Sequence, residues 1–170
     1  PKLCVNADDT LVRTLAEPST DRVLTFGTDY SSENAFYITW NGEVKECTED
    51  GFSYEINVKE EGLIEVKSAI PGKFNVYNAI AALCVCKALG LSVQDCAALL
   101  GSIQPEECRM KSFETDGVRS RMALVKNPAS FKVLADYVSS LDYDLALVLA
   151  LAAEPLDDMD LGWVKKTDLS

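Results

Sequence analysis

The stretch "PGKFNVYNAIAAL", residues 71–83, separates two kinds of hydrophobic pattern along the chain. Before it, apolar and polar residues alternate, and after it apolar residues recur at helical spacing. The Pro-Gly pair interrupts the first pattern, and we expect a helix over residues 75–89 that ends at Gly90. Asn75 and Asn78 stand at its start, although asparagine is unfavourable inside helices because its amide competes for backbone hydrogen bonds.

The region before this helix predicts a sheet with two parts. Residues 2–9, "KLCVNADD", and 22–29, "RVLTFGTD", are typical of apolar strands, and a short helix, "TLVRTLAE", separates them. This order predicts one βαβ unit of a parallel sheet. Residues 31–70 alternate and carry the turn signals Asn41-Gly42, Asp50-Gly51 and Glu61-Gly62, so we expect four antiparallel strands there.

The region after the helix predicts a second α/β segment. Ser92 is the expected N-cap of another helix, and Pro105 opens a polar stretch over residues 104–113 that we interpret as a linker. Three elements are expected beyond it: a strand over residues 119–128, an amphipathic helix over 129–141 and a buried parallel strand over 144–152.

Composition excludes several classes of function. The 170 residues are 48% hydrophobic and 25% charged, and the formal net charge is −11 with no histidine. Such an acidic chain is a poor candidate for nucleic-acid binding, and without histidine it forms neither a Ser-His-Asp triad nor a histidine metal site. No apolar run reaches membrane-spanning length, and we expect a reducing, cytoplasmic location for the six cysteines.

Several segments occur in an order that resembles the Mur ligase family, ATP-dependent enzymes that join an amino acid or amine to a carboxylate in cell-wall precursor synthesis. They are "VNADD", "TFG", the alternating region, "PGKFNVYNAIAALCVCKALGLS", "ECRMKSF" and "ALVKNPASFKVL". The segment "LVKNPASF" and the tail "DDMDLGW" are most similar to the MurT branch, the ligase-like subunit of lipid II isoglutaminyl synthase.

The resemblance implies an α/β fold in two parts. Residues 1–104 would be the latter part of the central ATP-binding domain, a partial parallel sheet with an antiparallel β-meander. Residues 105–170 would be a linker and the first part of the C-terminal domain, an incomplete Rossmann-like α/β unit.

The resemblance also implies nucleotide contacts for four residues. In this family the first asparagine of the helix motif hydrogen-bonds the adenine of ATP, and here that residue is Asn75. An amide suits the role because it donates and accepts hydrogen bonds at once. Asn127, with Lys126 beside it, matches a polar residue that approaches the nucleotide from the C-terminal domain, and Arg109 resembles the arginine near the hinge and the ATP.

Each of these residues also has a structural alternative. Asn75 would cap the helix while Asn78 packs in its first turn. Asn127 would form a plain turn before Pro128, and Arg109 would be a solvated linker residue.

Asp8 and Asp9 raise the question of a metal pair. Carboxylates in a loop after a strand are mostly caps, and we favour that reading for both residues. We therefore predict no metal ligand in this chain.

The chain departs from the family pattern in three ways. It has no glycine-rich GKT/S phosphate loop, because Gly72-Lys73 is followed by Phe74. The acidic residue and lysine that hold magnesium upstream of "NADD" are absent, and the alternating region has only Cys47 where MurT-type proteins carry a four-cysteine zinc ribbon.

These departures suggest that the chain is part of a longer ligase. The intact enzyme would use ATP and Mg²⁺ to phosphorylate a carboxylate of a cell-wall precursor, after which an amine or ammonia attacks the acyl phosphate. We expect this chain alone not to catalyse ligation. The alternative is a non-catalytic Mur-like module whose acidic surface docks a partner, such as a GatD-like glutaminase subunit.

Overall fold

The computed structural model describes residues 2–16, 22–28, 36–48, 51–106, 109–142, 144–150, 162 and 164. The chain divides into two compact units, Pro1–Glu106 (the first unit) and Glu107–Ser170 (the second unit). In chain order the elements are β1 (Leu3–Asn6), α1 (Thr10–Ala16), β2 (Val23–Gly27), β3 (Phe36–Thr48), β4 (Gly51–Val58), β5 (Gly62–Ser68), α2 (Lys73–Ala88), α3 (Val93–Leu100), β6 (Arg109–Thr115), β7 (Val118–Ala123) and α4 (Pro128–Ser139).

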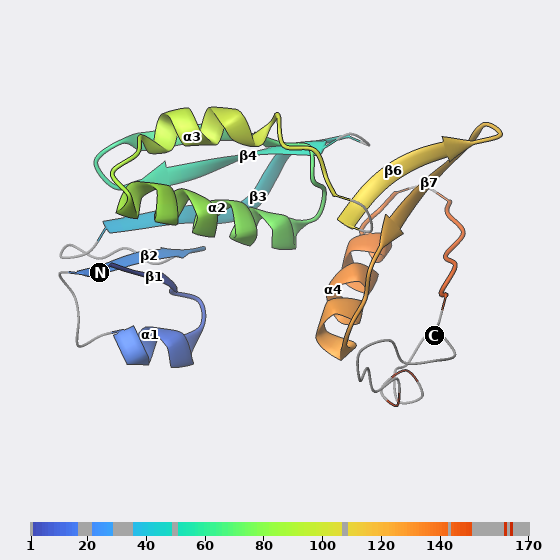
Figure 1. Cartoon of the computed structure of the whole chain (residues 1–170), viewed down its shortest axis with the longest axis horizontal. Coiled ribbons are helices and arrows are strands. Elements are labelled where there is room, and N and C mark those ends of the chain that lie inside the picture. Colours follow the sequence, from blue (N-terminus) through green and yellow to red (C-terminus); the bar gives the residue numbers. More distant parts are fainter. Residues whose placement is uncertain are drawn as a thin grey trace. The chain divides into compact units, whose positions relative to one another are not determined.

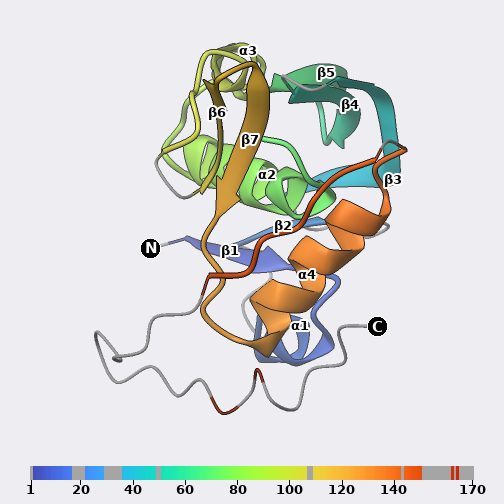
Figure 2. The same cartoon turned by 90° about the vertical axis from the view of Figure 1, so that its right-hand side faces the viewer.

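The first unit is built on a five-stranded sheet in the order β1-β2-β3-β4-β5. Strands β1 and β2 are parallel and joined through α1, which confirms the predicted βαβ unit. Strand β3 is also parallel to β2, and β4 and β5 continue as antiparallel neighbours. Helices α1 and α2 lie on opposite sides of β1 and β2 (Figures 1 and 2).

The prediction of four antiparallel strands over residues 31–70 is wrong in two respects. Three strands cover the described part of this region, and the first of them, β3, pairs in parallel with β2. Asn41-Gly42 forms no hairpin but an irregularity within β3, where the register to β4 shifts. The Asn41 side chain accepts a hydrogen bond from the Glu43 N–H, and the Trp40 indole donates to the Glu43 carbonyl, so the chain bulges and continues.

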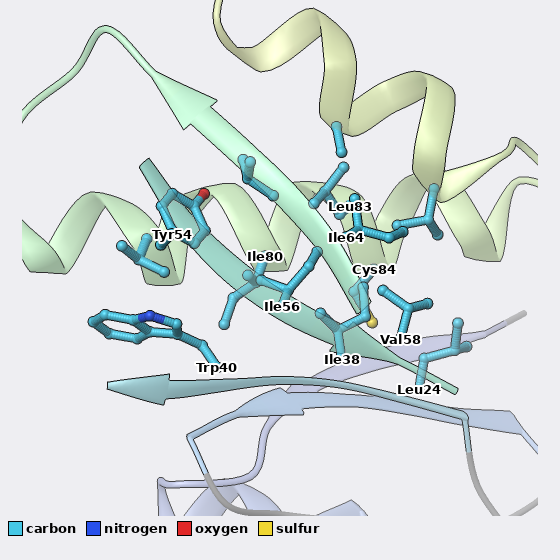
Figure 3. Packing of buried hydrophobic residues seen from close by; sticks show 14 of the residues in the cluster. Leu24, Ile38, Trp40, Tyr54, Ile56, Val58, Ile64, Ile80, Leu83 and Cys84 are labelled. Carbon is cyan, nitrogen blue, oxygen red and sulfur yellow. The ribbon is translucent and has the colours of Figure 1, made fainter. Parts of the chain in front are cut away.

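Helices α2 and α3 close the core of the first unit. Helix α2 begins at Lys73, two residues earlier than predicted, and Gly90 follows its end with φ 83°, as expected of a glycine after a helix. Ser92 caps α3 by accepting a hydrogen bond from the Asp95 N–H, as predicted. Ile80 and Leu83 of α2 pack against side chains of the strands such as Ile56 (Figure 3).

The predicted linker over residues 104–113 is wrong in its second half, because residues 109–115 form strand β6. It pairs antiparallel with β7 to make a two-stranded hairpin. Asp116 and Gly117 both have positive φ, 52° and 76°, as the tight turn of such a hairpin requires. Asp-Gly is a strong hairpin signal, so the sequence itself indicates this turn.

Helix α4 follows the hairpin and confirms the predicted amphipathic helix. The predicted buried strand over 144–152, however, is wrong: residues 144–150 form no strand and are exposed. A buried parallel strand needs neighbouring strands to satisfy its backbone and cover its side chains, and the described part of the second unit offers only the β6–β7 hairpin. None of the helices in the described ranges has the length and apolarity needed to span a membrane.

Candidate functional site

Two contacts fix the direction of α2 against the sheet. The Tyr77 hydroxyl donates to the Asp8 carboxylate at 2.8 Å, and Cys4 packs against the buried cluster that contains Cys84. Because Asp8 follows the end of β1 while Cys4 lies within it, α2 runs antiparallel to β1. The N-terminus of α2 therefore lies at the carboxyl edge of β1 and β2, where open α/β sheets bind ligands.

The side chain of Asn75 is held at this edge by two hydrogen bonds. Its Nδ2 donates to the Pro71 carbonyl at 2.6 Å, and its Oδ1 accepts from Asn78 Nδ2 at 3.1 Å. It does not cap the helix, because the N-cap residue is Gly72 and no side chain caps that end. The capping alternative for Asn75 is therefore wrong.

The remaining hydrogen-bonding capacity of this amide matches an adenine edge. An asparagine side chain has two N–H donors and two acceptor lone pairs, and the contacts within the described residues use one of each. Asn75 is half-buried and Asn78 is exposed, so the pair combines a fixed amide with an accessible one. The contact of Asn75 with a nucleotide base stays a prediction, and these two hydrogen bonds leave donors and acceptors of the pair for it.

The turn before α2 depends on Gly72. Its φ is 101°, and a Cβ at this position would lie 2.5 Å from the Phe74 ring. The glycine therefore lets the chain reverse tightly against Phe74 and enter the helix without a capping side chain. Among the first N–H groups of α2, that of Asn75 donates to the Gly72 carbonyl at 2.9 Å, and no side chain caps the others.

Asn127 is the N-cap of α4. Its Oδ1 accepts from the Ser130 N–H at 2.8 Å, and the Ser130 hydroxyl accepts from the Asn127 N–H at 3.1 Å, which completes a capping box. Lys126 is exposed, and its backbone N–H donates to the same hydroxyl at 3.1 Å. The structure thus brings Lys126 and Asn127 together at a helix N-terminus.

Arg109 lies on strand β6 and is not a linker residue. It is exposed and sits opposite Ala123, the last residue of β7, so it shares the open end of the hairpin with the segment that leads to Lys126. The register shifts directly after Arg109, where the buried Met110 has φ 67°. A bulge of this kind changes the direction of neighbouring side chains. Asn75 belongs to the first unit, whereas Arg109 belongs to the second.

Sequence reasoning missed the role of Asp8. Asp9 is a helix cap as predicted, because its carboxylate accepts from the Leu11 and Val12 N–H groups. Asp8 is not a cap: its carboxylate accepts from Thr28 and Tyr77. A signal existed, since "NADD" and "TFGT" end neighbouring parallel strands and such ends meet at one edge.

The described residues offer no cluster of side chains that would hold a metal ion without a bound substrate. No group of three or more cysteine, aspartate or glutamate side chains comes together among them. The Asp8 carboxylate, at the edge of the sheet, is already occupied by protein donors. No step of a reaction is therefore assigned to a metal held by this chain.

Comparisons with known proteins agree with the fold. The family model for the Mur ligase middle domain matches residues 2–86, half of the chain. The UDP-N-acetylmuramoyl-L-alanyl-D-glutamate–2,6-diaminopimelate ligase of Chromobacterium violaceum is 31% identical over 111 residues, which cover 64% of this chain and 21% of that protein. Subunit MurT of the lipid II isoglutaminyl synthase of Staphylococcus aureus is 27% identical over 113 residues, 66% of this chain and 25% of that protein.

A solved structure shows the same fold. MurF from Acinetobacter baumannii matches with a TM-score of 0.64 at 20% identity, over 82% of this chain and 29% of that chain. The chain therefore spans less than a third of the length of these relatives. The matched region contains the Asn75–Asn78 pair and the Asp8 edge of the sheet.

Proposed function

This chain belongs to the Mur ligase family, and we propose on that basis that it supplies the adenine-binding part of an ATP-dependent, amide-forming ligase of cell-wall precursor synthesis. The observation that carries the proposal is the Asn75–Asn78 amide pair at the N-terminus of α2. One donor and one acceptor of Asn75 are uncommitted among the described residues, and an adenine edge offers the complementary groups.

The proposed reaction has two steps. An oxygen of the acceptor carboxylate attacks the γ-phosphorus of ATP, and ADP leaves to give an acyl phosphate. An amine or ammonia then attacks the acyl carbon, the new C–N bond forms and phosphate leaves. In this reaction we propose that Asn75 binds and orients the adenine. Arg109, Lys126 and Asn127 of the second unit stay predicted nucleotide contacts on the family resemblance alone.

Asn75→Ala, made in the protein at its natural length, tests this proposal. We expect ATP affinity to fall about tenfold, because an amide contact to the base is lost. Isothermal titration calorimetry with ATP gives the Kd. The matched control is Asn57→Ala, an exposed asparagine on β4, which should leave the Kd unchanged. Equal ATP affinity in wild type and Asn75→Ala would count against adenine binding by this residue.

For the amine we propose ammonia, with lipid II glutamate as the acceptor, as in a MurT-like reaction with a glutaminase partner. The similarity to MurT over 66% of this chain and the "LVKNPASF" segment support this choice. The chain is comparably similar to a diaminopimelate ligase, so diaminopimelate is the alternative amine. Mass spectrometry of the product, with ¹⁵N-ammonium and diaminopimelate offered together, distinguishes them, because only the proposed reaction adds a single labelled nitrogen.

A further inference from the structure

The Asp8 carboxylate joins three segments that are far apart in the sequence. It accepts hydrogen bonds from the Thr28 N–H at 2.9 Å, from the Thr28 hydroxyl at 3.1 Å and from the Tyr77 hydroxyl at 2.8 Å. Asp8 follows β1, Thr28 follows β2 and Tyr77 lies on α2. One carboxylate therefore connects the ends of the parallel strands β1 and β2 to helix α2.

This contact requires glycine at position 27. A Cβ on Gly27 would lie 2.7 Å from Asp8 Oδ1, too close for any side chain. The backbone there has no unusual φ, so the requirement is for space and not for conformational freedom. The glycine of "TFG" thus makes room for the carboxylate of "NADD", which connects two motifs that the proposed function leaves without a role.

Tyr77 connects Asp8 to the first turn of α2, where the proposed adenine-binding residue Asn75 lies. It lies between Asn75 and Asn78, and its ring packs edge-on against Trp40 with centroids 6.1 Å apart. Burial raises the pKa of the Tyr77 phenol, and the hydrogen bond to Asp8 raises it further, so the hydroxyl stays protonated and donates. A hydrogen bond to a charged acceptor is stronger than one between neutral groups.

The first turn of α2 has few other ties to the sheet edge. No side chain caps the helix at Gly72, and the two bonds of Asn75 stay within residues 71–78. Val76 is buried and anchors one side of the turn in the core. The Tyr77–Asp8 bond is a polar link between this turn and the strand ends.

We propose that Asp8 and Tyr77 are positioning residues that hold the start of α2 at the carboxyl edge of the sheet and so set the orientation of Asn75 toward the base. This inference rests on the proposed adenine-binding function. The orientation of Asn75 should therefore set the selectivity for ATP over GTP. A misoriented amide loses the base-specific contact, whereas contacts to ribose and phosphates, which ATP and GTP share, are retained.

The test uses Tyr77→Phe and Asp8→Asn in the protein at its natural length, with the Kd values of ATP and GTP as readouts. Tyr77→Phe removes only the hydroxyl and keeps the ring on Trp40, so the fold should persist. We expect ATP affinity to fall about tenfold with GTP affinity unchanged. A merely structural role would lower the melting temperature without changing the ratio of the two Kd values.

Two controls separate the possible outcomes. Tyr54→Phe makes the same chemical change at a buried tyrosine whose hydroxyl has no partner among the described residues, and it should leave both Kd values unchanged. Asn75→Ala tests the proposed function itself. A loss of ATP selectivity in Asn75→Ala but not in Tyr77→Phe or Asp8→Asn would overturn the positioning role and leave the proposed function intact.

If the proposed function fails, hydrogen exchange still tests whether Asp8 and Tyr77 hold the start of α2. If wild-type protein shows no preference for ATP over GTP, adenine recognition is refuted, and exchange of the amides of residues 73–78 is compared between wild type and Tyr77→Phe. Faster exchange confined to these residues supports the anchoring of α2 by Asp8. Unchanged exchange overturns it as well.

Discussion

The first unit closes its sheet and helices over fully buried side chains such as Ile38, Ile56 and Ile80 (Figure 3). In the described part of the second unit, Met110 is the one buried side chain, and helix α4 has none. There, Arg121 donates to Ser112 of β6 and to the Tyr137 hydroxyl of α4. The first unit thus depends on apolar burial, and the second is linked through polar contacts, so equivalent substitutions should have different effects in the two.

The largest difference is expected between two leucines. Leu83 of α2 is 1% exposed, whereas Leu147 is 63% exposed. Leu83→Ala should lower the free energy of unfolding by about 3 kcal/mol through lost burial and a residual cavity, and Leu147→Ala should change it by less than about 0.5 kcal/mol. Urea denaturation followed by far-UV circular dichroism measures both. A large effect of Leu147→Ala would show that residues 144–150 are covered, and the contrast between the units would fail.

The next difference concerns two glycines with positive φ, Gly51 at the start of β4 and Gly117 in the β6–β7 turn. At Gly51, φ is 151° and a Cβ would collide with the backbone of Ser68 and Ala69, whereas at Gly117, φ is 76° and a Cβ would meet nothing. Gly51→Ala should therefore destabilise the protein by about 3 kcal/mol, and Gly117→Ala by about 1 kcal/mol from backbone strain alone. Thermal denaturation of the two variants checks this order. Equal losses would mean that the start of β4 or the end of β5 can shift to accommodate a side chain.

Helix caps should give smaller and similar effects in both units. Ser92 caps α3 and Asn127 caps α4, each through a side-chain oxygen on a backbone N–H. Ser92→Ala and Asn127→Ala should each cost about 1 kcal/mol, measured by urea denaturation. The matched controls Ser92→Thr and Asn127→Asp keep the oxygen and should stay near wild type. If Asn127→Asp destabilised as much as Asn127→Ala, capping would not explain the stability carried by Asn127.

The elements predicted correctly are those that local signals define. An apolar strand, a polar turn and a second strand predicted the parallel β1–β2 pair. Gly90 after the Ala-rich pattern predicted a helix that ends at residue 89, one residue beyond the observed end at Ala88. The Asn-Gly signal within β3 failed because a bulge and a turn demand the same positive φ, as at Gly42, and only the pairing with β4 distinguishes them.

The features that the sequence did not predict depend on residues far away in the chain. The apolar run of residues 144–150 is consistent with a buried strand, but its burial depends on neighbours that the pattern does not contain. Asn75 was found from a motif, whereas the contacts of Asp8 link residues 20 and 69 positions apart. Such contacts follow only from the strand order and the direction of α2. The sequence therefore predicted the candidate site residue on α2, Asn75, but not the contacts that Asp8 makes at the edge of the sheet.

The smallest difference at neutral pH is expected between two tyrosines. Tyr54 is fully buried in the first unit, and its hydroxyl has no hydrogen-bond partner among the described residues, while the Tyr137 hydroxyl in the second unit accepts from Arg121. Tyr54→Phe should leave stability within about 0.5 kcal/mol of wild type, and Tyr137→Phe should cost about 1 kcal/mol because Arg121 loses an acceptor. Urea denaturation at pH 7 compares them.

High pH should widen the difference in stability between the two tyrosine variants. Burial raises the pKa of the Tyr54 phenol far above its ordinary 10.0, so the folded state favours the protonated form. The resulting stability is fully present below the ordinary pKa and is lost as the pH rises through the range above it. Wild type and Tyr137→Phe should therefore lose stability above pH 10, and Tyr54→Phe should lose less, since it has no phenol to ionise there. Parallel losses in all three proteins would mean that water or another partner reaches the Tyr54 hydroxyl, and the first unit would then share the polar character of the second.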